Sequence, residues 1–223
     1  MSSRLAVDGM WSRRGSETVI RDLSLAVEPG EVVLVTGANG SGKSTLLESI
    51  AGVLRPAAGE VQLDGVRIDG MSADHVARSG LSLVHQQRRL FSSLTVRENV
   101  EMAAFAAGRR ACLEPVSAVL ERFGIARLAS TAAGLLSGGE QRLVALARGL
   151  RSMPRLLLLD EPLAALAVEA RDRLLVELRR VAAAGTSIVV VEHDSERVEP
   201  LADRVLALRM GDLVTVAHHG ARP

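Results

Sequence analysis

A glycine-rich turn constrains this sequence more than any other feature. Gly37-Ala-Asn-Gly-Ser-Gly-Lys-Ser-Thr45 follows the apolar run Val32–Thr36, which indicates a buried strand, and precedes apolar residues at helical spacing up to Leu54. Strand, turn and helix in this order match the phosphate loop G-x-x-x-x-G-K-[ST] in the context that the motif requires. The sequence therefore predicts a phosphate-binding site carried by an α/β fold.

The residue types of this turn suit a nucleotide and its metal ion. Glycines let successive backbone amides face one anion, and the amino end of the helix adds partial positive charge. Lys43, the only lysine in the chain, is expected to neutralise the β and γ phosphates, and the Ser44 hydroxyl to ligate Mg²⁺. The alternative is a glycine-rich turn with no ligand. The candidate nucleotide contacts are Gly37, Asn39, Gly40, Ser41, Gly42, Lys43, Ser44 and Thr45.

Two adjacent acids follow an aliphatic strand later in the chain. Residues 156–159 are all leucine, and Asp160 and Glu161 come directly after them. A buried strand presents such carboxylates at its carboxyl end, where ligands of parallel sheets bind. We expect Asp160 to hold Mg²⁺ through water and Glu161 to orient and deprotonate an attacking water molecule.

A second turn of anion-binding type begins a later helix. Leu136-Ser-Gly-Gly-Glu-Gln141 offers a hydroxyl and backbone amides at a helix amino end, so Ser137, Gly138, Gly139 and Gln141 are candidate nucleotide contacts. One nucleotide hardly needs two such turns in one chain. We therefore expect this turn to close on the γ phosphate held by another copy; the alternative is a capped structural helix with Ser137 at its N-cap.

Strand and helix signals alternate along most of the sequence, which favours a mostly parallel sheet. A run of helical signals interrupts this alternation. We expect one domain over residues 1–223, with a core of residues 1–94 and 153–223 and a helical subdomain of residues 95–152. The expected helices are 44–54, 96–107, 115–123, 139–151 and 168–184, and the expected later strands are 81–85, 155–159, 187–191, 205–208 and 213–216, with a hairpin at 59–68.

Composition excludes some classes of function. Apolar residues make up 48% of the chain, yet uninterrupted aliphatic runs such as residues 188–191 span four residues, whereas a membrane helix needs roughly 20. We therefore expect a soluble, intracellular chain. The net charge of +1 gives no indication of a nucleic-acid partner.

Together these motifs resemble those of an ATP-binding cassette (ABC) ATPase, the nucleotide-binding subunit of an ABC transporter, over essentially the whole chain. The resemblance implies a P-loop NTPase (RecA-like) core with an N-terminal antiparallel β subdomain and an inserted α-helical subdomain. It also implies binding of ATP and Mg²⁺, and ATP hydrolysis in a sandwich formed by a homodimer or by a heterodimer with a paralogous ATPase. Transmembrane permease subunits would be the partners, docked near residues 86–99, and the location would be cytoplasmic, on the inner face of the cell membrane.

The resemblance lends roles to three further residues. Gln86 resembles the Q-loop glutamine, which ligates Mg²⁺ and senses the membrane partner, although neighbouring Gln87 is also a candidate. His193, after the strand at 187–191, resembles the switch histidine that contacts the γ phosphate. Trp11 resembles the aromatic residue that stacks on adenine; the alternative is a half-buried strand residue.

One position departs from the family pattern. Ala167 stands where the family usually has an aspartate that crosses the dimer interface. The branched-chain amino-acid importer ATPases, which the chain loosely resembles, also carry alanine at this position. Since Lys43, Asp160, Glu161 and His193 are present, we expect hydrolysis to persist. No feature names the cargo or the direction of transport. A soluble ABC ATPase in assembly or repair and a regulatory module that binds ATP without hydrolysis are the alternatives.

Overall fold

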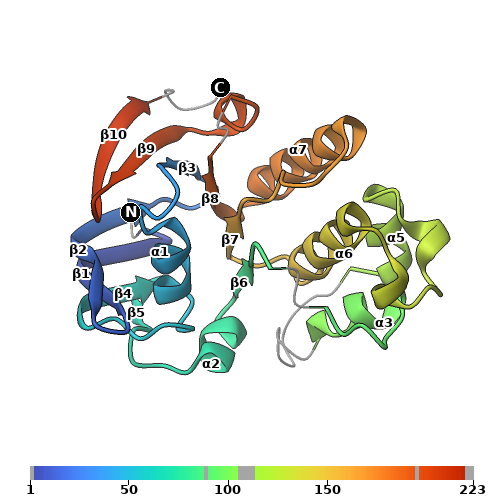
Figure 1. Ribbon diagram of the computed structural model, residues 1–223, viewed down its shortest axis with the longest axis horizontal. Helices are drawn as coiled ribbons and strands as arrows, with labels where there is room; N and C mark the ends of the chain where they lie inside the picture. Colours follow the sequence, from blue (N-terminus) through green and yellow to red (C-terminus); the bar gives the residue numbers. More distant parts are fainter. Residues whose placement is uncertain (1–2, 88–89, 105–113, 194–195, 219–223) are drawn as a thin grey trace.

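The computed structural model describes residues 3–87, 90–104, 114–193 and 196–218, and their strands form two sheets (Figure 1). The larger sheet has the strand order β10-β9-β3-β8-β7-β6. Its strands are β3 (Val32–Thr36), β6 (Leu81–Val84), β7 (Leu156–Asp160), β8 (Ser187–Glu192), β9 (Arg204–Arg209) and β10 (Asp212–His218). All neighbours in it pair in parallel except β10, which pairs with β9 in antiparallel fashion.

Both faces of the parallel sheet are covered, which is why its strands are apolar without interruption. Val32 and Leu34 of β3 belong to a hydrophobic cluster shared with the helices on one face. Val33 and Val35, which alternate with them, belong to a second cluster on the opposite face. The predicted α/β class with a mostly parallel sheet is confirmed.

The smaller sheet is antiparallel and contains the amino-terminal strands. Its order is β2-β1-β4-β5, formed by β1 (Leu5–Arg14), β2 (Glu17–Val27), β4 (Ala58–Leu63) and β5 (Val66–Arg67). Asp64 and Gly65 join the last two strands with φ of 50° and 75°, as a type I′ turn requires. This confirms the predicted hairpin.

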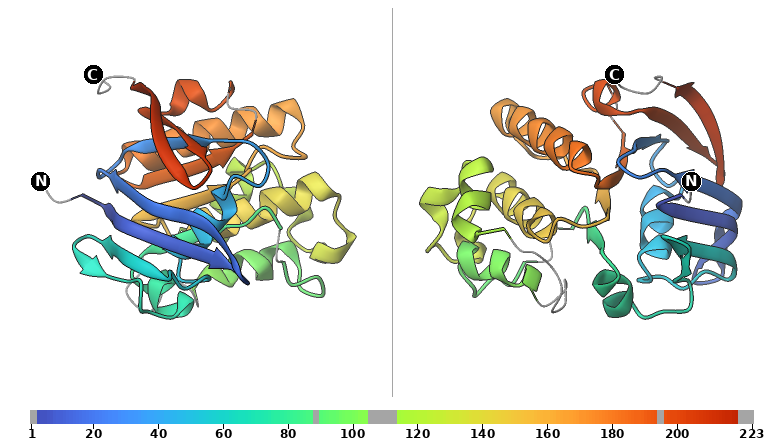
Figure 2. Two further views of the ribbon diagram at one scale, coloured as in Figure 1. Left: turned by 60° about the vertical axis from the view of Figure 1, so that its left-hand side comes forward. Right: turned by 180° about the vertical axis from the view of Figure 1, so that it is seen from behind.

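The helices divide into two groups on either side of the parallel sheet (Figures 1 and 2). On one side α1 lies against the antiparallel sheet, and on the other α3, α5 and α6 form a separate lobe. The helices are α1 (Lys43–Ile50), α2 (Ala73–Arg78), α3 (Val96–Glu101), α5 (Val116–Arg122), α6 (Gly138–Arg151) and α7 (Val168–Ala183), with 3₁₀ turns at Ala126–Leu128, Ala133–Leu135 and Glu199–Leu201. The lobe helices fall within residues 95–152, and the domain boundaries themselves stay a prediction.

Three helices differ from the sequence expectation. Helix α1 ends at Ile50 instead of residue 54 because Gly52 takes a left-handed φ of 69°, which ends the helix. Helix α2 was not predicted, since only Val76 of its six residues is buried. Residues 105–107 of the helix expected at 96–107 lie outside the described residues. Within the described part of the chain, none of the helices has the length and apolar character needed to cross a membrane.

Candidate functional site

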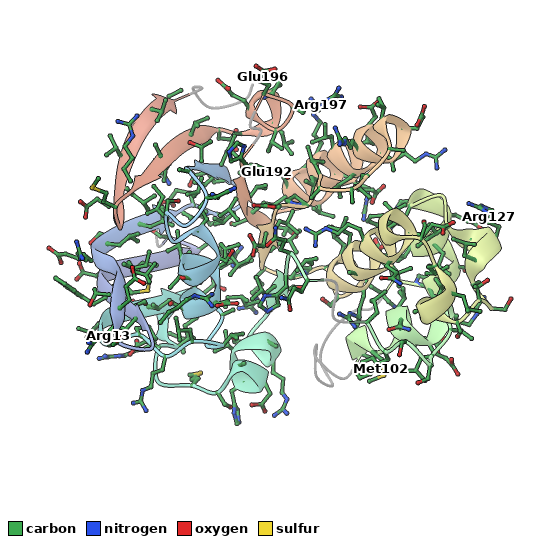
Figure 3. The ribbon with its side chains drawn as sticks, in the orientation of Figure 1. Arg13, Met102, Arg127, Glu192, Glu196 and Arg197 are labelled. Atoms are coloured by element: carbon green, nitrogen blue, oxygen red, sulfur yellow. The ribbon has the colours of Figure 1, made fainter. Side chains whose placement is uncertain are left out.

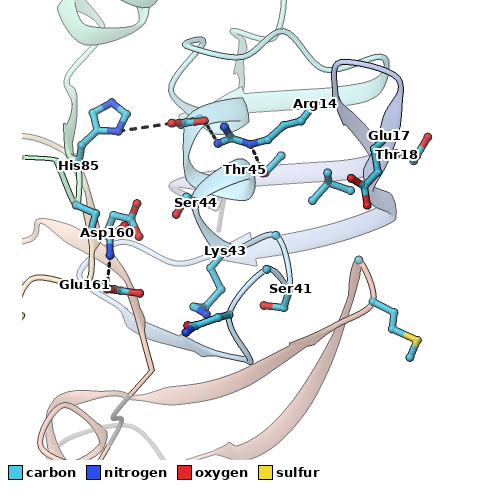
Figure 4. Close-up of a pocket in the computed structure, with 18 of the residues that line it drawn as sticks. Arg14, Glu17, Thr18, Ser41, Lys43, Ser44, Thr45, His85, Asp160 and Glu161 are labelled. Carbon is cyan, nitrogen blue, oxygen red and sulfur yellow. Dashed lines mark hydrogen bonds and ion pairs between the residues drawn. The ribbon is translucent and has the colours of Figure 1, made fainter.

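A cavity of about 930 Å³ opens where the carboxyl ends of the parallel strands meet the amino end of α1 (Figure 4). Residues 39–45 of the glycine-rich turn line its middle. Asp160 and Glu161 lie toward one end, and Gln86, which bonds to Glu161, lines the cavity together with Gln87. The structure therefore brings the predicted phosphate loop, the paired acids and both candidate glutamines into one site.

The glycine-rich turn is held against β2 in a shape that requires glycine. Gly42 is the N-cap residue of α1 and has a φ of 105°, in the left-handed region. A Cβ atom there would lie 2.9 Å from Val19 Cγ1 and 3.0 Å from Ile20 Cδ1, which is too close. Gly40, with a φ of 80°, also adopts a left-handed conformation. The backbone of the turn is thus fixed by packing before any ligand arrives.

The polar side chains of the turn suit an anion. Lys43 is buried, and its Nζ atom donates to the carbonyl oxygens of Gly37 and Ala38 at 2.7 and 3.0 Å. The buried Ser41 Oγ has no hydrogen-bond partner. A buried hydroxyl of this kind needs an acceptor or a donor from elsewhere. A phosphate group bound in the turn would supply it, so these residues fit a nucleoside triphosphate.

The acidic end of the cavity fits a magnesium ion bound mostly through phosphate and water. Asp160 is buried at the end of β7, and Glu161 follows with a φ of 47°. Gln86 Nε2 donates to Glu161 Oε2 at 2.7 Å. Among the described residues no group of three or more His, Cys, Asp or Glu side chains could hold a metal alone. Mg²⁺ commonly uses one or two protein ligands beside phosphates, and Ser44 with Asp160 is such a pair.

Arg142 fastens the ends of two strands to the lobe helix α6. Its side chain is buried, and its guanidinium donates to the backbone carbonyls of His85, Gln86, Asp160 and Glu161. The contacts with Gln86 and Glu161 are 3.1 and 2.6 Å long. Sequence reasoning missed this residue, because an arginine among the buried positions of a helix carries no signal of where its side chain ends.

The Ser-Gly-Gly turn lies apart from the cavity of its own chain. Ser137 Oγ accepts from the Glu140 amide at 3.3 Å, while the Ser137 amide donates to Glu140 Oε2 at 3.0 Å, which forms a capping box. Hydrogen bonds from the Ser137 hydroxyl, at 2.8 Å, and from the Ser137 amide to this carboxylate hold the pKa of the Glu140 carboxyl below its ordinary value. Gln141 Nε2 donates to the carbonyls of Ala133 and Leu136, both at 3.2 Å. None of these residues lines the described cavity, and neither does Gly138 or Gly139.

The loop between β7 and α7 packs against this turn. A Cβ atom on Gly139 would lie 2.9 Å from the carbonyl oxygen of Ala165, so the close approach of that loop requires glycine within the chain itself. Ala167 is exposed and serves as the N-cap of α7 without a side-chain hydrogen bond. The carboxylate that the family usually carries there is thus replaced by a methyl group that makes no polar contact.

Glu192, labelled in Figure 3, is the last residue of β8, and His193 follows it directly. His193 is exposed and does not line the described cavity. Glu192 is buried, and its Oε1 atom accepts from the Leu163 amide at 2.9 Å. Burial raises the pKa of the Glu192 carboxyl above its ordinary value, and the nearby charge of Glu161 acts in the same direction. The switch role of His193 stays a prediction.

Trp11 points away from the cavity, whereas Arg14 lines it. Ser12 faces α1, because its Oγ atom accepts from Ser49 at 2.8 Å in a buried contact. Trp11 precedes it in the strand and lies on the opposite face, 39% exposed and outside the cavity lining. Arg14, two residues after Ser12, returns to the cavity face, and its Nε atom donates to Thr45 Oγ1 at 2.9 Å. Sequence alternation alone does not reveal this position, because the register of β1 shifts between Ser12 and Arg13.

The family model and the curated relatives that match this chain all belong to ABC transporters or their ATP-binding proteins. Residues 20–164 match a family model described as ABC transporter. The chain is 35% identical over 214 residues to the high-affinity branched-chain amino acid transport ATP-binding protein BraG of Pseudomonas aeruginosa, covering 94% of this chain and 91% of that protein. It is 40% identical over 212 residues to the Fe(3+) ions import ATP-binding protein FbpC of Streptomyces coelicolor, covering 94% of this chain and 60% of that longer protein.

The solved structures agree with this match. A structure of an ATP-binding subunit of an ABC transporter superposes with a TM-score of 0.86 at 26% identity, covering 96% of this chain and 90% of its own. The likeness therefore extends over both sheets and the helical lobe.

Proposed function

This chain belongs to the ABC transporter family as an ATP-binding subunit, and from that premise we propose that it hydrolyses MgATP to drive transport through separate transmembrane subunits. One observation carries the proposal: a single cavity holds the phosphate loop in its middle and the carboxylates of Asp160 and Glu161 at one end. This arrangement places a base and a metal ligand where the γ phosphate of a bound nucleotide would lie.

The roles of the side chains follow from their positions. The backbone amides of residues 37–45 and Lys43 bind the β and γ phosphates, and Ser44 and Asp160 hold Mg²⁺, which when bound withdraws charge from the phosphate oxygens. Glu161 takes the proton of the attacking water while the water oxygen bonds to the γ phosphorus. At the same time the bond between the γ phosphorus and the β–γ bridging oxygen breaks. ADP and inorganic phosphate are the products.

Gln86 controls whether Glu161 can act. In this structure its amide donates to Oε2 of the Glu161 carboxylate, so one oxygen of the base is engaged by a protein group. We infer that Gln86 leaves Glu161 when the nucleotide binds, and its amide oxygen would then be a further ligand for Mg²⁺. Because the carbonyl of Gln86 is bound by Arg142 of α6, movement of the helical lobe acts on Gln86 directly. Gln87 lines the same cavity, but among the described residues it is Gln86 that bonds to Glu161.

Two chains are needed for a complete site in this proposal. The capped turn at Ser137, Gly138 and Gly139 stands outside the cavity of its own chain, which leaves the amides of Gly138 and Gly139 for a nucleotide held elsewhere. We infer that two copies, or this chain and a paralogue, enclose two nucleotides between phosphate loop and capped turn. Because residue 167 is alanine, the carboxylate that the family usually places between the two sites is missing in this chain.

The surface beside Gln86 is the docking region we propose for the transmembrane subunits. The Phe91 backbone is fixed at both ends by the buried Asn99, whose Oδ1 accepts from the Phe91 amide at 2.9 Å and whose Nδ2 donates to its carbonyl at 3.0 Å. The Phe91 side chain is 49% exposed, so an apolar group is held outward on a firm backbone. Such docking places the chain at the inner face of the cell membrane.

Steady-state phosphate release from MgATP tests the proposal. Glu161→Gln should lower kcat at least about 100-fold while nucleotide binding persists, because the carboxamide cannot accept the proton. Lys43→Ala should lower binding itself. Glu121→Gln, an exposed glutamate on α5, is the matched control and should leave kcat unchanged. Unaltered turnover in Glu161→Gln, or no phosphate release by the wild-type chain at any ATP concentration, would refute the assignment.

A further inference from the structure

We propose that the guanidinium of Arg14 is the platform on which the nucleobase lies, in place of the aromatic ring expected at Trp11. Among the described residues that line the cavity, none is Phe, Trp or Tyr. The inference rests on the proposed function, since it concerns the base of the nucleotide whose phosphates bind at residues 37–45.

The direction of the nucleotide follows from the two ends of the cavity. The γ phosphate belongs beside Asp160 and Glu161, so the base must extend toward the opposite end, past Thr45. Figure 4 shows Arg14, Glu17 and Thr18 on that side of the phosphate loop. These residues form the tip of the β1–β2 hairpin, in which Arg14 pairs with Glu17. The hairpin tip is therefore the part of the chain that the base meets.

Arg14 is held in an orientation that leaves its flat faces for a ring. Its Nε atom donates to Thr45 Oγ1 at 2.9 Å, and its Nη2 atom forms an ion pair with Glu48. On the other side of Glu48, its Oε1 atom lies 3.7 Å from His85 Nδ1. Both bonds of Arg14 lie along the edge of the guanidinium plane. A guanidinium held by its edge can stack on an aromatic ring and attract it through the ring quadrupole.

Apolar groups on β2 and on the β9–β10 turn complete this end of the cavity. A Cβ atom on Gly211 would lie 2.8 Å from the Val19 carbonyl oxygen, so the turn packs directly against β2. This packing brings Met210, 89% exposed, to the cavity beside Val19. A thioether is flexible and makes favourable contacts with aromatic rings. Burial against a base would also remove the exposed Met210 side chain from water.

Recognition by a planar cation depends on the face of the base and not on its edge. Every purine offers such a face, so adenine and guanine nucleotides should bind with affinities within about fivefold of each other. A lysine at this position would keep the charge but lose the plane. A tyrosine would supply a ring and should preserve or strengthen binding.

Calorimetric titration of the full chain with three magnesium complexes tests the proposal. MgATP and MgGTP carry a base, whereas magnesium tripolyphosphate has the same phosphates without one. Arg14→Ala and Arg14→Lys should each weaken binding of both nucleotides about fivefold and leave the affinity for tripolyphosphate unchanged. Arg14→Tyr should bind both nucleotides at least as tightly as the wild type.

Arg13→Ala is the matched control. Arg13 is an exposed arginine one position away, and its Nη2 atom donates to the Ser16 carbonyl at 3.0 Å, at the tip of the hairpin (Figure 3). It lies on the strand face opposite Arg14, so its replacement should change none of the three affinities. Trp11→Ala, which removes the ring, should also leave them unchanged, and nucleotide binding should not quench the emission of Trp11, the only tryptophan.

Three results would overturn the proposal: an equal loss of tripolyphosphate affinity in Arg14→Ala, full nucleotide affinity in Arg14→Lys, or a loss of nucleotide affinity in Trp11→Ala. The first would make Arg14 a phosphate ligand, the second would make its charge sufficient, and the third would return the base to Trp11. A failure of the proposed function looks different. Tripolyphosphate would then not bind the wild-type chain, or would bind Lys43→Ala equally well.

Discussion

Replacing Arg142 by methionine removes the guanidinium that joins the strand ends beside the candidate site. Four backbone carbonyls accept from this buried group, on two strands and the residues that follow them. A hydrogen bond to a charged group contributes about 1.5 to 3 kcal/mol, but bonds to one cation do not add independently. We therefore expect a loss of about 3 to 5 kcal/mol in the free energy of unfolding, which is less than the sum of four independent bonds because water can reach some of the released carbonyls.

Urea unfolding followed by circular dichroism measures this loss. Arg127→Met on the surface is the control, since its side chain is 73% exposed and its pair with Glu140 is 3.3 Å long. Exposed pairs of this kind contribute at most about 1 kcal/mol. The Arg142→Met chain should also lose kcat beyond its loss of stability, because the carbonyls of Asp160 and Glu161 are released. A destabilisation below about 1 kcal/mol would refute the view that Arg142 fastens these strands.

Three further changes have expected outcomes. Burial raises the pKa of Glu192, so the contribution of its protonated carboxyl to stability is present below the ordinary value of 4.5 and is lost as pH rises. From pH 4.5 upward, the free energy of unfolding of Glu192→Gln should therefore increase relative to that of the wild type. A difference between the two that does not change with pH would contradict this. Gly42→Ala places a Cβ atom 2.9 Å from Val19 and should abolish MgATP binding in a titration, whereas retained affinity would show that the loop adjusts. Gln86→Ala should lower ATPase turnover about 10-fold or more, and Gln87→Ala should lower it much less. The reverse ranking would assign the Q-loop role to Gln87.

The phosphate loop and the paired acids could be predicted from the sequence because each is contiguous. Lys43 acts with its immediate neighbours, and Asp160 and Glu161 end one uninterrupted strand. The roles of these residues could therefore be predicted without knowing which distant segments contact them. The strand-turn-helix order around Lys43 was confirmed for the same reason.

Arg14 and Glu192 could not be identified in this way, because their positions depend on contacts between distant segments. Trp11 was chosen for its residue type, but strand β1 is irregular near Gly9, with register shifts between Val7 and Met10 and again before Ser12. These irregularities decide which side chains face the cavity. Glu192 is buried because the β7–α7 loop covers it, and nothing in the sequence around residue 192 specifies that loop.

Light scattering of the purified Glu161→Gln chain, with and without MgATP, tests the central claim most directly. The variant should retain the phosphate clamps while lacking the base, so ATP should shift the scattering mass from that of one chain to that of two. Ser137→Arg in the same background should bind ATP and stay monomeric, since the capped turn would no longer reach a second nucleotide. A chain that binds MgATP yet keeps the mass of a monomer would contradict closure of two copies of this chain on the nucleotide.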